Sequence, residues 1–334
     1  MTGTPTDRGR TAISRSRNRS TASGSRTVIP SEGRGGFGFD RGSDRRVTGR
    51  SAIRGSRSGS YSYVRDRWHG AIARADGWRG RSGAWRSSPI RDRWYRWGSG
   101  IRSSWWPRHR YYARSWFTPS WWSRYRHRLG GWHYWPAYRR YDVGFWWSAP
   151  AWPVLSSWFV WPSSGIWDQP IYYDYGPGGN VVYENNYVYV NEVPVATTTE
   201  FAESAYALAT VPPPPEEEVL NDIDWMPLGT FALSTGEGDR EPERVLQLAV
   251  NPQGIVSGTL YNTRTEEVEA IEGQVDEETQ RVAFRVVDNP EIVFETGLYN
   301  LTQDVAPVLM HFGTDWTEEY VLARLEYPEE EQLE

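Results

Sequence analysis

Residues 244–262 read RVLQLAVNPQGIVSGTLYN and carry the clearest β-strand pattern in the C-terminal part of the chain. Leu246, Leu248 and Val250 occupy every second position, which is the period of a β-strand with one buried face. The Asn-Pro-Gln-Gly sequence at 251–254 is typical of a turn, and a second strand-like run follows it. The pattern predicts two neighbouring strands joined by a short turn.

The same alternation continues on both sides of this stretch, over residues 220–328. Strand-like runs at 225–233, 281–286, 292–294 and 320–327 are separated by turns such as 288–290 and 313–315, and no long helical pattern interrupts them. Short strands at regular spacing predict an antiparallel meander of about eight strands. Closing the meander removes its two edges. We therefore predict an all-β fold, a small up-and-down, calycin-like barrel, for residues 220–328.

Two small elements are expected before the barrel. Within residues 169–210, two Val/Tyr-rich runs flank Asn185-Asn186, which suits a two-residue hairpin turn because asparagine tolerates positive φ. Thr197 and Glu200 then have the spacing of a capping box at the start of a short helix. The sequence predicts a β-meander and a helix here, a Pro/Glu linker at 211–219, and an acidic tail at 329–334.

The charge is divided sharply between the two halves of the chain. Residues 1–140 hold 31 arginines and 7 acidic residues, a balance of +24, whereas residues 141–334 hold 6 arginines and 35 acidic residues, a balance of −29. A segment this basic attracts polyanions, and it can also pair with the chain's own acidic domain.

The front half does not read as an ordinary globular domain. Residues 1–60 are rich in Arg, Ser and Gly, and residues 61–168 alternate arginine with Trp and Tyr while aliphatic residues are scarce. We expect the first segment to be disordered and the second to be mostly disordered, because both contain too few aliphatic side chains to form a close-packed core. Residues 143–167 carry no charge, but Pro150, Pro153 and Pro162 interrupt them; no integral membrane span is expected.

No pattern points to catalysis or to a cofactor. The chain has no cysteine, which excludes disulfides, cysteine-based zinc sites and cysteine nucleophiles. The motifs of serine hydrolases, zinc proteases and nucleotide-binding loops are missing from the sequence. His311 lies opposite in phase to Val308, Met310 and Phe312, and we expect it on a solvated strand face. We predict no catalytic, cofactor-binding or metal-binding residues and no enzymatic activity.

Several stretches from residue 172 onward carry a family resemblance. They read YDYGPGGNVVY at 173–183, YVNEVPV at 189–195, WMPLGTFAL at 225–233, LQLAVN at 246–251, ETGLYNLT at 295–302 and HFG at 311–313. Together they resemble a family of uncharacterised planctomycete envelope proteins labelled mu-protocadherin-like cell-surface proteins. The resemblance implies export to the cell surface and assigns no functional residues. No apolar signal segment follows Met1, so we expect that either the protein stays inside the cell or its true start lies upstream.

These observations favour a non-catalytic structural or interaction protein of the cell surface. Envelope polysaccharide or another polyanion is the expected partner of residues 1–140. Two alternatives remain open at this point: a barrel that binds a small ligand in its mouth, and a protein that binds nucleic acid through the Arg/aromatic front.

Overall fold

A computed structural model describes residues 53–74, 89–135, 137–161 and 165–328, all of which belong to one compact unit. Of the segment 1–60 that is predicted to be disordered, residues 1–52 lie outside the described residues, as does the acidic tail at 329–334. Residues 53–60 begin helix α1 (Ile53–Arg74), so the prediction of disorder is wrong for them. The barrel strands are β4 (Met226–Ser234), β5 (Arg244–Val250), β6 (Ile255–Asn262), β7 (Val268–Val275), β8 (Arg281–Val286), β9 (Asn289–Gly297), β10 (Val305–Phe312) and β11 (Trp316–Leu325).

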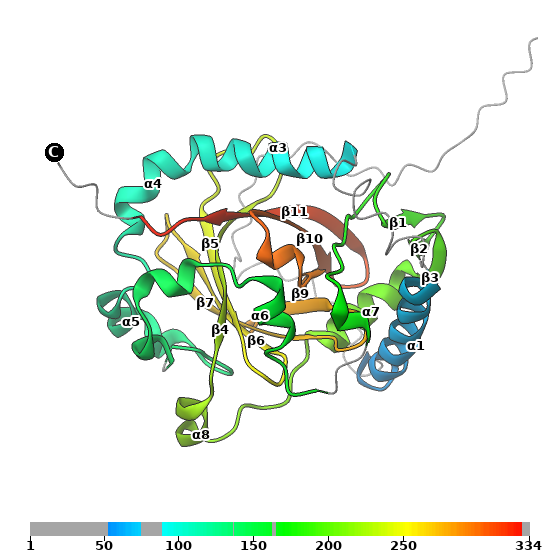
Figure 1. Ribbon diagram of the computed structural model, residues 1–334, viewed down its shortest axis with the longest axis horizontal. Helices are drawn as coiled ribbons and strands as arrows, with labels where there is room; N and C mark the ends of the chain where they lie inside the picture. Colours follow the sequence, from blue (N-terminus) through cyan, green and yellow to red (C-terminus); the bar gives the residue numbers. More distant parts are fainter. Residues whose placement is uncertain (1–52, 75–88, 136, 162–164, 329–334) are drawn as a thin grey trace, which may run out of the picture. The chain divides into compact units, whose positions relative to one another are not determined.

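These strands form a closed, antiparallel eight-stranded barrel (Figure 1). Each strand pairs with the next along the chain, and β11 closes the barrel by pairing with β4, with Ala323 opposite Ala232. Because β11 pairs with β4, the sheet has no edge strand. The predicted up-and-down barrel is confirmed.

The barrel interior is filled by its own side chains. Leu246, Leu248 and Val250 are fully buried, and Phe284 stacks on Phe294 with ring centroids 5.1 Å apart. A Cβ added at Gly258 would lie 2.6 Å from the Leu248 side chain. Even one extra methyl group at this position has no room.

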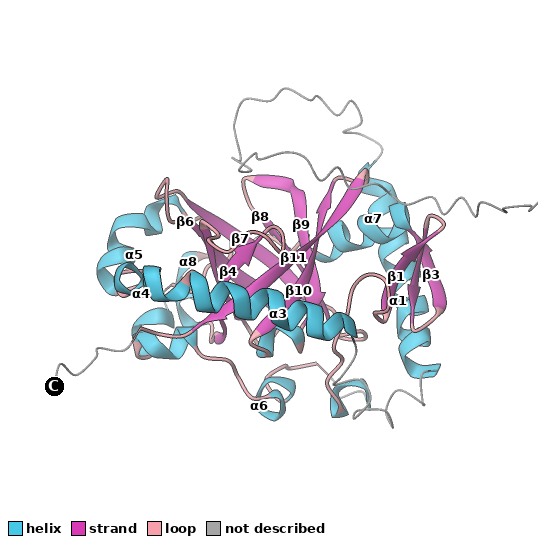
Figure 2. Cartoon of the chain, turned by 90° about the horizontal axis from the view of Figure 1, so that it is seen from above, coloured by secondary structure: helices cyan, strands magenta, loops and turns pink. Residues whose placement is uncertain are grey.

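A large part of the outer face of the barrel is also apolar, and the Arg/Trp-rich segment covers that part (Figures 1 and 2). The elements of this cover are α1 (Ile53–Arg74), α3 (Pro89–Ser104), α4 (Trp106–Ala113), α5 (Pro119–Tyr125), η2 (Arg126–Arg128), η3 (Ala137–Arg140), η4 (Val143–Trp147), α6 (Trp152–Ser156) and η5 (Gly165–Asp168). Their indole rings, among them Trp94, Trp105 and Trp146, are buried against outward side chains such as Val245 and Val321.

The prediction that residues 61–168 are mostly disordered is therefore corrected for the described residues. The prediction relied on the scarcity of aliphatic residues, but tryptophan supplies the apolar surface instead. Each aromatic ring buries more surface than an aliphatic side chain. The barrel and its aromatic cover share one core rather than forming separate domains.

A small sheet and a helix complete the fold. Strands β1 (Val181–Glu184), β2 (Tyr187–Val190) and β3 (Val193–Thr197) form an antiparallel meander. Asn185 and Asn186 have φ of 51° and 65° between paired Glu184 and Tyr187, as expected for the two-residue turn. The capping box of Thr197 and Glu200 begins α7 (Thr198–Leu208), which packs against α1.

The expected linker at 211–219 is partly helical. Helix α8 (Glu217–Asp222) crosses its predicted boundary with the barrel, and the carbonyl of Pro212 accepts a hydrogen bond from Trp132 Nε1 at 2.8 Å. One turn, η6 (Asn300–Thr302), lies between β9 and β10. Within the described ranges, no helix has both the length and the apolar character needed to cross a bilayer.

Candidate functional site

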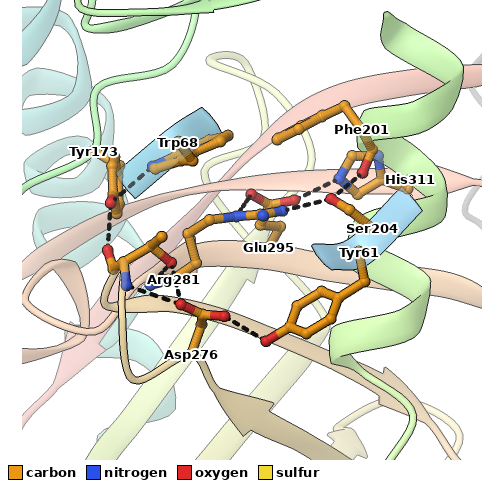
Figure 3. A network of polar contacts seen from close by, with 10 residues as sticks. Tyr61, Trp68, Tyr173, Phe201, Ser204, Asp276, Arg281, Glu295 and His311 are labelled. Atoms are coloured by element: carbon orange, nitrogen blue, oxygen red, sulfur yellow. Dashed lines mark hydrogen bonds and ion pairs between the residues drawn. The ribbon is translucent and has the colours of Figure 1, made fainter. Parts of the chain in front are cut away.

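Three charged or titratable side chains meet on the outer face of β8, β9 and β10 (Figure 3). Arg281 Nε lies 3.0 Å from Glu295 Oε1, and His311 Nε2 lies 3.1 Å from Glu295 Oε2. All three side chains are fully buried. Burial of an ion pair costs desolvation energy, which good geometry and further hydrogen bonds must offset.

The cover over this group comes from α1 and α7. Trp68 and Phe201 stack with centroids 5.3 Å apart and nearly parallel planes, and the Arg281 guanidinium carbon lies 4.4 Å from the Trp68 ring and 5.1 Å from the Phe201 ring. Arg281 Nη2 also donates to Ser204 Oγ at 3.1 Å. A single arginine on the barrel therefore holds both helices.

A second set of hydrogen bonds extends the network along the same face. Tyr61 of α1 donates its hydroxyl to Asp276, whose other carboxylate oxygen accepts from the Thr279 hydroxyl at 2.7 Å. Trp68 Nε1 donates to the Tyr173 hydroxyl at 3.0 Å, and Tyr173 donates to the Thr279 carbonyl. Helix α1 is thus fixed at two points seven residues apart (Figure 3).

The electrostatics of the group follow from burial and charge together. Burial alone raises the pKa of Glu295, but Arg281 and His311 outweigh it and hold that pKa below its usual value. Burial raises the pKa of the Tyr61 phenol, and the neighbouring Asp276 raises it further. Glu295 is therefore a carboxylate and Tyr61 a neutral hydrogen-bond donor at neutral pH.

This arrangement lacks the features of a catalytic site. Ser204 Oγ donates to the Phe201 carbonyl at 2.8 Å, so its hydroxyl is not paired with His311. Fully buried side chains also offer a substrate no approach. The group acts as an internal clamp between the barrel and the two helices, which we call the Arg281 clamp (Arg281, Glu295, His311).

The expectation of a solvated His311 is wrong. The residue points away from the barrel interior, as its phase predicts, but α7 covers that face, and the Phe201 ring lies 5.5 Å from the imidazole. The sequence reasoning missed Arg281 and Glu295 for the same reason. Their only signal was a charge at outward strand positions, which normally indicates a solvated face.

A buried carboxyl outside the clamp gives a pH-dependent prediction. Asp174 precedes the turn at Gly176 and is 2% exposed, and its Oδ1 has no hydrogen-bond partner among the described residues. Burial raises its pKa to about 7, and Arg91 opposes this only in part. The charged form is thus disfavoured in the folded state.

We expect Asp174→Asn to stabilise the protein increasingly as pH rises from 4 to 8. Because the folded pKa lies above the unfolded value of 3.8, the folded state binds the extra proton, and wild-type stability falls as that proton is lost. The gain of the variant over wild type should grow by roughly 2–4 kcal/mol over this range. Urea unfolding at several pH values measures it; a gain that does not change with pH contradicts the assignment.

The cover also pairs its arginines with the acidic barrel. Ion pairs link Arg93 to Glu237 and Glu319 at 2.7 Å, Arg102 to Asp304 at 3.2 Å, and Arg140 to Asp224 at 2.9 Å. Arg108 is also paired with Glu241. These pairs are partly exposed, so each contributes at most about 1 kcal/mol. They neutralise part of the charge difference between the halves.

A second group of arginines stays exposed. The group lies on α5, η2 and η3 and consists of Arg124, Arg126, Arg128 and Arg139. Arg124 and Arg128 lie over the Tyr125 ring. None of the four has a carboxylate partner in the described part of the chain. Arg126 and Arg139 both lie over the Trp135 ring, at 4.9 and 5.5 Å. We call this group the Trp135 arginine surface.

No group of His, Asp or Glu among the described residues could hold a metal ion. The fold and these sites define an eight-stranded up-and-down barrel with an aromatic outer cover. Comparisons with protein families, with curated proteins and with solved structures found no match to the chain.

Proposed function

We propose that this chain is a non-catalytic interaction protein of the cell surface that binds acidic polysaccharide through the Trp135 arginine surface. The observation that carries the proposal is a group of four exposed arginines without carboxylate partners among the described residues, two of which, Arg126 and Arg139, lie over the partly exposed Trp135 indole. Arginine binds carboxylate groups in a bidentate manner, and an indole face offers a flat apolar surface to a sugar ring. The surface location is supported by the family resemblance alone, and labelling of intact cells with an impermeant reagent tests it.

The filled barrel interior weighs against the small-ligand alternative. A calycin-like binder needs an internal cavity, whereas Leu248 and Ile271 already leave no space for a methyl group on Gly258. The nucleic-acid alternative uses the same arginines, since charge and base stacking suit Arg and Trp equally well. We therefore place RNA among the outcomes of the binding experiment.

We expect the double variant Arg126→Gln, Arg139→Gln to bind polygalacturonate at least tenfold more weakly than wild type, because each arginine lost removes a charge-assisted contact. Wild-type affinity should fall with rising salt, and neutral dextran should not bind. Microscale thermophoresis of the full chain measures these affinities.

The matched control is Arg67→Gln with Arg264→Gln, which removes two exposed charges elsewhere. It should retain most of the binding. An equal loss of affinity in both double variants would show that only the net charge of the protein matters and would contradict the proposal. Tighter binding of single-stranded RNA than of polygalacturonate would replace the proposal with the nucleic-acid alternative.

A further inference from the structure

A pocket of about 120 Å³ lies between α3 and the turn that joins β4 to β5. Positions 93, 96, 97 and 100 of the helix share one face because of their spacing, and positions 237 and 240 of the turn lie opposite. The lining residues are Arg93, Arg96, Trp97, Gly100, Glu237 and Arg240. None of them belongs to the Arg281 clamp or to the Trp135 arginine surface.

Hydrogen bonds hold the two walls of the pocket together. Trp97 Nε1 donates to Ser234 Oγ at 2.8 Å, and Ser104 Oγ donates to the Arg240 carbonyl at 3.0 Å. Within the turn, the Asp239 carboxylate accepts from the Thr235 backbone N–H at 3.1 Å. Two hydrogen bonds therefore join the helix to the β4–β5 region beside the pocket.

The arginines of the pocket differ in what they bind. Arg93 is occupied, because it bonds Glu237 and Glu319 at 2.7 Å each. Arg96 and Arg240 are exposed, and within the described ranges neither guanidinium has a hydrogen bond or an ion pair. Among the lining residues the only carboxylate is Glu237, and it is paired with Arg93.

Gly100 explains how the Arg240 guanidinium reaches this position. A Cβ at Gly100 would lie 3.2 Å from Arg240 Nη1 and 3.6 Å from its Cζ, so the guanidinium packs on the helix backbone itself. Glycine lowers helix stability relative to alanine, and here its small size lets the guanidinium lie close against the helix. Arg96 lies one turn earlier on the same face of α3, so the pocket is lined by two guanidinium groups without partners among the described residues, those of Arg96 and Arg240.

We propose that this pocket binds one tetrahedral oxyanion, a sulfate or phosphate group, through Arg96 and Arg240. Guanidinium groups bind such oxygens with paired, charge-assisted hydrogen bonds. A pocket this small is below the range that takes whole drug-sized ligands, which limits it to a single group. The group is either a free ion or an ester carried by a sugar. The inference is independent of the polysaccharide proposal, because it uses other residues.

The test is calorimetric titration of the full chain with sodium sulfate at constant ionic strength set by sodium chloride. Wild type should give saturable binding, and Arg96→Gln with Arg240→Gln should weaken it at least tenfold. Gly100→Leu should also abolish it, because the new side chain fills the pocket without changing any charge. The control pair Arg67→Gln with Arg264→Gln should bind sulfate as wild type does.

Far-ultraviolet circular dichroism and melting in chloride establish that each variant is folded. Unchanged sulfate affinity in the Arg96/Arg240 variant, or equal loss in the control pair, overturns the proposal. Competition between a sulfated disaccharide and inorganic sulfate identifies the source of the group. If the disaccharide displaces inorganic sulfate, the natural ligand is a sulfate ester on a sugar; if only inorganic sulfate binds, the natural ligand is the free ion. Both of these results retain the site.

Discussion

Replacing Glu295 with glutamine should destabilise the protein by about 3–5 kcal/mol. The change removes one charge of a fully buried pair and leaves Arg281, which lies against the stacked Trp68 and Phe201 rings, without its ion-pair partner. An uncompensated buried charge is among the costliest defects in a folded protein. Because Arg281 holds both α1 and α7, the loss should appear as release of these helices. Urea unfolding and amide hydrogen exchange of residues 61–74 measure the two effects.

The control is Glu243→Gln, which breaks the exposed pair with Arg264 at 2.9 Å. It should cost less than about 1 kcal/mol. The pH dependence gives an independent check. The folded pKa of Glu295 lies below its unfolded value of 4.5, so its contribution is present above that pH and is lost as the pH falls. Equal costs for both variants would show that the Arg281 clamp stabilises nothing.

Residues 220–334, produced without the preceding segment, should self-associate or precipitate instead of forming a stable monomeric barrel. In the full chain the aromatic cover buries apolar side chains on the outside of the barrel, including Val245, Ile255, Val268, Val321 and Leu325. Exposed together, they form a continuous apolar patch of the kind that drives association. Light scattering and binding of a hydrophobic dye compare the fragment with the full chain.

Supplying residues 53–219 as a second polypeptide should restore solubility, because the cover and the barrel share their core. The ion pairs from Arg93, Arg102 and Arg140 to barrel carboxylates should guide this association. A monomeric fragment that unfolds cooperatively at the temperature of the full chain would mean that the barrel is an independent domain after all.

The barrel could be predicted from the sequence because its signal is local. Alternation at Leu246, Leu248 and Val250, followed by turn residues at 251–254, specifies strands and reversals without reference to the rest of the chain. The Asn185-Asn186 turn and the Thr197–Glu200 capping box were predictable for the same reason. In each case a few neighbouring residues carry the whole physical argument.

The sites could not be predicted in this way. Arg281 and Glu295 lie 14 positions apart and meet only because β8 pairs with β9. Arg96 comes from α3 and Arg240 from the β4–β5 turn, two elements far apart in the sequence. A charged or titratable residue at an outward strand position is predicted to be solvated when nothing in the sequence shows what covers it. The prediction that His311 is solvated was wrong for this reason.

Composition and two-residue periodicity are properties of short stretches. A polycationic aromatic front, an acidic all-β C-terminal part and the order of its strands could therefore be predicted from the amino acids alone. The packing of the front onto the barrel is visible only in the folded chain. Burying Trp94, Trp105 and Trp146 requires an apolar surface supplied by strands more than 80 residues away, and that surface exists only once the barrel has closed. Helices α1 and α7 cover the outward-facing charges of β8, β9 and β10, and these charges therefore form the buried Arg281 clamp.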